Sequence, residues 1–238
     1  FRSCMTIIPY MERIVVFNSV YSEYATQHHM PHHGARRNPQ TGHSMKLLHL
    51  DSSILGDHSA SRAISAGIVA RWQHAVPGLE VLDRDLAGTH ALPHLDGTSL
   101  AKSDPTEAAR SQRVLEDFLA ADVIVIGAPM YNFGIPSQLK AWIDRVAISG
   151  KTFRYTAEGP QGLSGSKQVF VAATYGGMHP VDSGRNFVEP YLRQVFGFLG
   201  IDDVVFISAE GLNISPEQRA LALETADANI DEMLPLAA

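Results

Sequence analysis

Four serines surround the predicted start of a helix: Ser52, Ser53, Ser59 and Ser61. Ser59 is placed to cap the helix, and hydroxyls, unpaired first-turn amides and the positive end of the helix dipole together form an anion site. The segment lacks Gly-x-Gly-x-x-Gly and Gly-Lys-Ser/Thr, which disfavours a nucleoside triphosphate with magnesium and leaves a lone phosphate monoester. Taken alone, simple capping is the better interpretation, because serines at helix starts are common.

A second segment that could do chemistry is aromatic. Met130, Tyr131, Asn132 and Phe133 follow an uninterrupted apolar run, and Gly134 and Pro136 come soon after. Large apolar side chains in a loop are costly to leave in water, so we expect something flat and apolar to cover them. The alternative is that they pack over the end of a sheet, which is the more frequent outcome for an arbitrary strand, loop and helix.

The third segment is Thr174-Tyr175-Gly176-Gly177. Glycine has no Cβ, so its backbone can approach a ligand closely and offer amides to a polar edge. The alternative is a tight turn without a ligand.

These segments need elements to position them. Short apolar runs predict five strands, and helical spacing of apolar residues predicts helices between them. The third run has four consecutive β-branched residues, which suits a strand buried on both faces, and it should stop at Gly127 before Pro129. The strands are expected at 46–50, 79–82, 123–126, 169–173 and 204–208, and the helices from 59, 106–121, 137–146, about 187–199, and from 216.

Strands that alternate with helices favour an α/β fold, with a doubly wound five-stranded parallel sheet and helices on both faces. In such sheets ligands bind outside the carboxyl ends of the strands. The serine, aromatic and glycine segments follow the first, third and fourth strands, so we call them loop one, loop three and loop four.

Composition excludes several classes. The chain has 238 residues, of which 45% are hydrophobic and 18% charged, as in an ordinary globular protein. A net charge of −6 argues against a nucleic-acid partner. A single cysteine, Cys4, rules out a disulfide framework or a cysteine-based metal site. No apolar stretch approaches the length of a membrane span, so we expect no membrane partner, no metal and a cytoplasmic location.

Residues 1–44 differ from the rest of the chain. A histidine-rich tract with prolines and glycines has no long apolar periodicity, and a solvated tail is favoured over a metal-binding tract. We expect a disordered N-terminal extension over 1–44 and one domain over 45–238; an upstream start outside the mature protein would explain the extension equally well. The histidines are His28, His29, His32, His33 and His43.

The motifs also carry a family resemblance. Ala128-Pro129-Met130-Tyr131-Asn132-Phe133, followed by Pro136-Ser137-Gln138-Leu139-Lys140-Ala141-Trp142-Ile143-Asp144-Arg145, resembles the flavin-contacting loop and next helix of flavodoxin-like FMN oxidoreductases. More narrowly, it is similar to the FMN-dependent NADH-azoreductases among the NAD(P)H–quinone oxidoreductases. The likeness covers nearly everything from Met45 onward. The family usually has Ser-Arg-Gly-Gly where this chain has Thr174-Tyr175-Gly176-Gly177, so the role of that arginine is absent.

The resemblance implies strand order 2-1-3-4-5, bound FMN, and NADH as electron donor. It implies a cytoplasmic homodimer that reduces quinones to hydroquinones and cleaves aromatic azo compounds, by ping-pong transfer of two electrons. No protein residue need be catalytic, because the chemistry lies on FMN. The implied FMN contacts are Ser53, Ser59, Ala60, Ser61, Met130, Tyr131, Asn132, Phe133, Thr174, Tyr175, Gly176 and Gly177.

Three residues are weaker candidates for contact with the substrate: His179, Tyr155 and Phe196. A lone histidine is more often structural, but the position of His179 after the glycine turn fits a residue that binds substrate or donates a proton. Tyr155 and Phe196 could wall the flavin face, although Phe196 has the helical spacing of a core residue. Two other functions stay open, namely an electron carrier that binds FMN without a substrate of its own, and a binding module without FMN.

Overall fold

The computed structural model describes residues 44–100, 103–165 and 167–233. The expected N-terminal extension lies outside these residues. The strands are β1 (Lys46–Asp51), β2 (Glu80–Asp85), β3 (Val123–Pro129), β4 (Phe153–Thr156), β5 (Gly159–Gly162), β6 (Gln168–Thr174) and β7 (Val204–Ala209). The helices are η1 (Gly56–His58), α2 (Ala60–Ala75), α3 (Gly97–Leu100), α4 (Pro105–Ala120), α5 (Ser137–Val146), η2 (Val181–Ser183), α6 (Glu189–Phe198) and α7 (Pro216–Met233).

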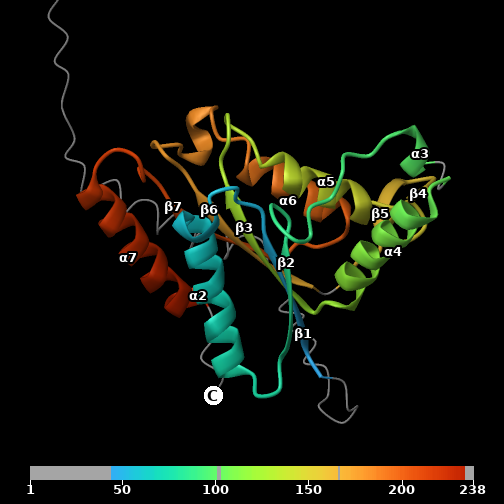
Figure 1. Cartoon of the computed structure of the whole chain (residues 1–238), viewed down its shortest axis with the longest axis horizontal. Helices are drawn as coiled ribbons and strands as arrows, with labels where there is room; N and C mark the ends of the chain where they lie inside the picture. Colours follow the sequence, from blue (N-terminus) through green and yellow to red (C-terminus); the bar gives the residue numbers. More distant parts are fainter. Residues whose placement is uncertain (1–43, 101–102, 166, 234–238) are drawn as a thin grey trace, which may run out of the picture. The chain divides into compact units, whose positions relative to one another are not determined.

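Five strands form one parallel sheet in the order β2-β1-β3-β6-β7 (Figure 1). Numbered among themselves these are strands 2-1-3-4-5, so the predicted order is confirmed. The expected short excursion after α5 is a separate antiparallel hairpin of β4 and β5.

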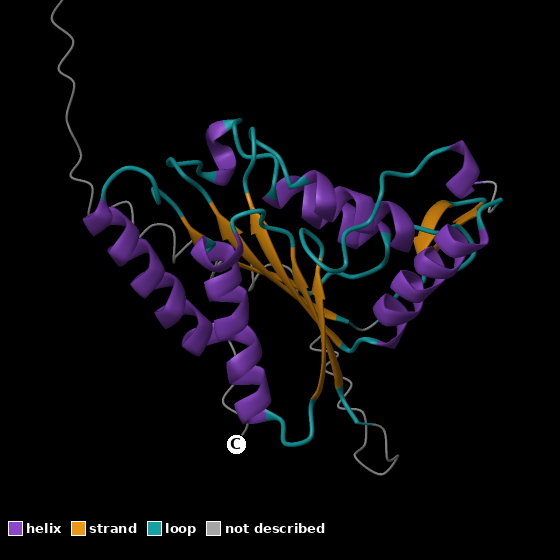
Figure 2. Cartoon of the chain, in the orientation of Figure 1, coloured by secondary structure: helices purple, strands orange, loops and turns teal. Residues whose placement is uncertain are grey.

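Helices cover both faces of the sheet (Figure 2). Helices α2 and α7 pack on one face through residues such as Ile68 and Ala226, which are fully buried. Helices α4, α5 and α6 cover the other face, where Phe118, Trp142 and Leu192 join a second core cluster. Every residue of β3 is buried, as a strand between two helical layers requires.

The prediction that the third strand stops at Gly127 was wrong, because β3 continues to Pro129. The ladder with β1 ends where Asp51 pairs with Gly127, so beyond that point β3 has a neighbour only in β6. A proline without an N–H is tolerated in a stretch that is paired on one side. The longer strand carries the chain two residues further before loop three begins.

Helix boundaries follow local signals. Ser59 accepts a hydrogen bond from the Arg62 amide at 3.3 Å, which confirms it as the N-cap of α2. Helix α6 ends before Gly200, whose φ of +86° only glycine adopts readily, and the Ile201 amide donates back to the Phe196 carbonyl. Because β1, β3 and β6 run parallel, loops one, three and four leave these strands at the same edge of the sheet.

Candidate functional site

Loop one places two hydroxyls at the start of α2. The Ser59 and Ser61 Oγ atoms lie 3.0 Å apart, and both residues are buried. The amides of Ala60 and Ser61 belong to the first helical turn, where a helix supplies no acceptor of its own. Because these donors and the helix dipole point the same way, the arrangement fits an anionic group such as a phosphate.

The other two serines of loop one serve a structural purpose. Ser52 donates to the Gly127 carbonyl at 2.6 Å and is fully buried, so it ties loop one to β3. The Ser53 hydroxyl lies 3.2 Å from the Tyr131 hydroxyl, which also accepts from the Ile54 amide at 3.3 Å. Tyr131 therefore joins loop three to loop one, and both expected contact residues already have partners.

A buried polar network lies beneath loop one. His49 Nδ1 is 2.8 Å from Asp83, and its Nε2 is 3.0 Å from Ser65 Oγ, which in turn donates to Asp51 at 3.0 Å. Burial opposes protonation of His49, but the hydrogen bonds and negative charges of Asp51 and Asp83 prevail and raise its pKa above the ordinary value. A Cβ on Gly127 would lie 2.7 Å from the Asp51 carboxylate, which explains the glycine in β3.

Arg62 links this network to the loop itself. Its guanidinium donates to Asp85 at 2.6 Å and to the Ser53 carbonyl at 2.9 Å, and it lies 3.6 Å from Asp51. Burial raises the pKa of Asp51, but hydrogen bonding, His49 and the positive charge of Arg62 outweigh it and lower that pKa. The backbone of loop one is thus fixed by charged groups below it, which leaves the first-turn donors free to bind a ligand.

Loop three makes a tight turn with exposed side chains. The amide and carbonyl of Tyr131 pair with those of Gly134, at 2.9 and 3.1 Å. The two corner residues have positive φ, 49° at Asn132 and 71° at Phe133. Asparagine adopts this conformation at little cost, but a phenylalanine does so under strain. Half of the Phe133 surface is exposed, so an uncommon backbone holds an aromatic ring towards solvent.

Loop four presents its backbone and buries its side chains. Thr174 and Tyr175 are 5% and 1% exposed, and the Tyr175 hydroxyl accepts from Asn186 Nδ2 at 3.2 Å. Burial, followed by the charges of Glu189 and Glu210, raises the pKa of Tyr175 to about 12. The expectation that Thr174 and Tyr175 contact a cofactor holds at most for their backbones, because their side chains belong to the core.

The glycines of loop four are held by the segment that follows β7. The amides of Gly211, Leu212 and Asn213 donate to the carbonyls of loop four, at 2.9 to 3.1 Å. A Cβ on Gly176 would lie 2.6 Å from Asn213 Nδ2, and the φ of Gly176 is not positive. The amides of Gly176 and Gly177 make no hydrogen bond to any described residue, so they remain as donors.

The three candidates for substrate contact occupy different places. The His179 amide donates to Glu210 at 2.7 Å, and its ring lies edge-on to Phe133 with centroids 5.9 Å apart. Tyr155 lies on β4 and is 72% exposed. Phe196 has no exposed surface and packs in the core of α6, so its expected contact with a substrate is corrected: no ligand can reach this ring in the chain as folded.

The sequence did not point to three residues that shape the site. Asn186 donates to the His179 carbonyl at 2.9 Å and to Tyr175, while Glu210 and Asn213 bind His179 and Gly176 from the loop after β7. The position of Glu210 and Asn213, directly after the fifth strand, was the available signal, because that strand ends at the same edge of the sheet.

Comparison with known proteins identifies the protein family to which the chain belongs. Residues 45–234 match a protein family described as having a flavodoxin-like fold. The chain belongs to this family, and the resemblance drawn from its loop motifs is confirmed.

Individual proteins that are similar to this chain are more specific than the family match. The chain is 55% identical over 188 residues to FMN-dependent NADH:quinone oxidoreductase 1 of Xanthomonas axonopodis pv. citri, covering 79% of this chain and 96% of that one. It is 52% identical to FMN-dependent NADH:quinone oxidoreductase of Ralstonia nicotianae, covering 80% and 97%. The crystal structure of an FMN-dependent NADH-azoreductase from Bacillus anthracis in complex with FMN superposes with a TM-score of 0.72 at 24% identity, covering 79% and 96%, which shows a shared fold.

Two further properties bear on the site. Among the described residues, no group of three or more histidines, cysteines or acidic residues could hold a metal ion. No helix in that part of the chain is both long and apolar enough to cross a membrane.

Proposed function

We propose that this protein is an FMN-dependent oxidoreductase that uses NADH to reduce quinones to hydroquinones. The observation that carries the proposal is the convergence of three loops with unpaired donors at one edge of the sheet. Ser59 and Ser61 flank free amides in loop one, Gly176 and Gly177 offer free amides in loop four, and Phe133 is held exposed between them. Relatives 55% identical over most of their length are named for this activity.

The residues fit the groups of FMN separately. The first turn of α2 and the hydroxyls of Ser59 and Ser61 would hold the phosphate. Free amides and the positive end of the helix dipole favour an anion there, without a charged side chain at the centre of the site. The amides of Gly176 and Gly177 would bind the polar edge of the ring. Asn132 adds a side-chain amide from loop three, and Phe133 and Met130 supply apolar surface beside it.

When bound, FMN would supply the hydride-transfer and two-electron chemistry that connects NADH to the acceptor. The chain's own contribution is to orient both reactants over one exposed face and to keep that face apolar. Phe133 packs edge-on to the His179 ring, and this pair forms a wall at loop three. Because NADH and the acceptor would use the same face in turn, we propose ping-pong kinetics, with aromatic azo compounds as a second class of flat acceptor.

We also propose that the protein acts as a homodimer. An apolar groove beside loop three is lined by Ile135, Phe187, Pro190 and Tyr191, between the start of α5 and α6. Phe187 is 58% exposed there, and its amide donates to the Phe133 carbonyl at 3.2 Å. Covering this groove with a second copy would complete the wall of the flavin site. Sedimentation equilibrium measures this directly, and a monomer at micromolar concentration would contradict it.

The test of the activity uses purified protein without added cofactor. We expect a yellow protein whose flavin absorbance bleaches anaerobically on adding NADH and returns on adding 1,4-benzoquinone. Steady-state rates with both substrates varied should give parallel double-reciprocal lines. A yellow protein that NADH does not bleach would instead be an electron carrier, and a colourless protein that binds no FMN would overturn the proposal.

A further inference from the structure

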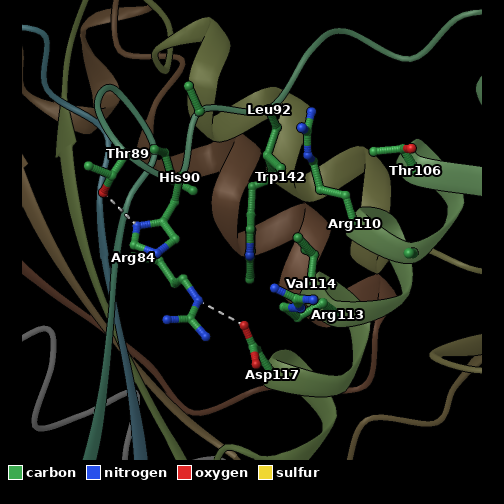
Figure 3. A pocket seen from close by; sticks show the side chains of 13 residues that line it. Arg84, Thr89, His90, Leu92, Thr106, Arg110, Arg113, Val114, Asp117 and Trp142 are labelled. Carbon is green, nitrogen blue, oxygen red and sulfur yellow. Dashed lines mark hydrogen bonds and ion pairs between the residues drawn. The ribbon is translucent and has the colours of Figure 1, made fainter.

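A cavity of about 540 Å³ lies away from the three loops, between helix α4 and the segment that follows β2 (Figure 3). None of its lining residues belongs to loop one, three or four. Apolar side chains from α4, from α5 and from the segment after β2 line much of the cavity. These apolar residues are Leu86, Ala91, Leu92, Ala109, Val114 and Trp142. We call this cavity the arginine pocket, for the residues described next.

Three guanidinium groups line the arginine pocket: Arg84, Arg110 and Arg113 (Figure 3). Arg84 donates to Asp117 at 2.9 Å, so these two charges offset each other. Among the described residues that line the cavity, Asp117 is the only carboxylate.

The other two arginines are less well neutralised. Arg110 donates to Glu107 at 3.2 Å, but the other oxygen of Glu107 already binds the fully buried Arg145. Arg113 makes no hydrogen bond or ion pair with any residue that the structure describes. The pocket therefore combines an apolar floor with excess positive charge at its wall.

The wall after β2 is already in place without a ligand. The Asp85 carboxylate accepts from the Ala87 amide at 3.1 Å, and the Asp85 carbonyl accepts from the His90 amide at 2.9 Å. His90 Nδ1 lies 3.3 Å from the Asp85 amide, which closes the turn from the other side. Because this turn is held by its own hydrogen bonds, a ligand would lose little affinity to ordering it.

We propose that the arginine pocket binds an organic carboxylate with a flat apolar body, at a site separate from the flavin. A planar guanidinium matches the two oxygens of a carboxylate, and a free one such as Arg113 gains most from such a partner. A volume of about 540 Å³ lies within the range of small-molecule sites, and a mostly apolar lining with few polar groups is their usual composition.

The experiment titrates FMN-loaded protein with 2-naphthoate by isothermal titration calorimetry and repeats it with 2-naphthylmethanol, a neutral analogue of similar size. We expect a dissociation constant of about 1 mM or tighter for the acid, as its number of heavy atoms allows. Arg113→Gln should weaken it by about tenfold, and the neutral analogue should bind as weakly to wild type as the acid does to this variant. Ala109→Phe, which fills the cavity without a change of charge, should abolish binding.

The matched control is Arg219→Gln, which removes an arginine from α7 on the other face of the sheet and should leave the affinity unchanged. The flavin absorption spectrum should not shift during the titration, since the sites are separate. The proposal fails if wild type does not bind 2-naphthoate, or if Arg113→Gln and Ala109→Phe both bind it normally. It also fails if the flavin spectrum shifts and both variants retain that shift, because the acid would then occupy the flavin site.

Discussion

Loop three and loop four follow neighbouring strands, β3 and β6, yet they prepare a site in opposite ways. Loop three exposes its side chains: Asn132 and Phe133 sit at the corners of a turn with positive φ. Loop four hides its side chains, with Tyr175 in the core, and presents the amides of Gly176 and Gly177. One loop offers aromatic surface and the other offers hydrogen-bond donors.

The two loops also differ in which residues bear the energetic cost of the loop conformation. In loop three the cost is local, because an aromatic residue is held in a backbone region that favours glycine. In loop four the cost falls on a neighbour, because Asn213 occupies the space that a Cβ on Gly176 would need. We therefore expect a substitution in loop four to destabilise the fold, and a substitution in loop three to impair the reaction at the flavin without destabilising the fold.

The largest effect is expected from Gly176→Ala. A Cβ there would lie 2.6 Å from Asn213 Nδ2, so either loop four or the segment after β7 must move. We expect a loss of about 1 to 3 kcal/mol in the free energy of unfolding, with weaker FMN binding. Urea denaturation and FMN titration measure the two effects.

The control for Gly176→Ala is the double variant Gly176→Ala/Asn213→Ala. Removing the Asn213 amide leaves its Cβ 3.7 Å from the new methyl group, an ordinary contact, so stability should return most of the way. Equal damage in the single and double variants would show that the steric role assigned to Asn213 is wrong.

A smaller and opposite effect is expected from Phe133→Gly. Glycine tolerates a φ of 71°, so the free energy of unfolding should stay level or rise by about 1 kcal/mol. Hydride transfer from NADH should slow, because the exposed ring that walls the site is lost. Stopped-flow bleaching and thermal unfolding test both halves. A destabilised variant that reduces its flavin at the wild-type rate would assign the ring to packing alone.

The smallest effect on the flavin site is expected from Tyr175→Phe. Because the folded pKa of Tyr175 is raised to about 12 from 10, its contribution to stability is full below pH 10 and is lost as the pH rises towards 12. The variant should lack this alkaline loss and give up about 1 kcal/mol at neutral pH for the hydrogen bond from Asn186. Its affinity for FMN should stay within about twofold of wild type; a tenfold loss would place the hydroxyl at the cofactor.

Much of this fold could be predicted because its signals are local. The apolar run of β3, the cap at Ser59 and the glycine stop at Gly200 each lie within a few residues of the element that they define. Helix α5 has the predicted bounds, Ser137–Val146. The loops at the carboxyl edge followed from the strand order.

What the sequence could not show depends on contacts between distant segments. Gly176 must lack a Cβ because Asn213, which follows a different strand, occupies that space. Gly127 must lack one because of Asp51 on β1. The burial of Tyr175 and Phe196 is set by neighbours from other elements. Packing of this kind decides which way a side chain points at the end of a strand. A motif can therefore predict which residues contact a ligand, but the structure is needed to tell whether the contact comes from the side chain or from the backbone.

The central claim, that the start of α2 holds the phosphate of FMN, is tested most directly by Ser59→Asp. Ser59 and Ser215 both cap helices, accepting from the amides of Arg62 and Gln218, and aspartate caps equally well. Ser215→Asp is therefore the matched control. The measurement is the ratio of dissociation constants for FMN and riboflavin in wild type and both variants. We predict that Ser59→Asp raises this ratio by about tenfold or more through repulsion of the phosphate, while Ser215→Asp leaves it unchanged. An unchanged ratio in Ser59→Asp would show that the phosphate is bound elsewhere.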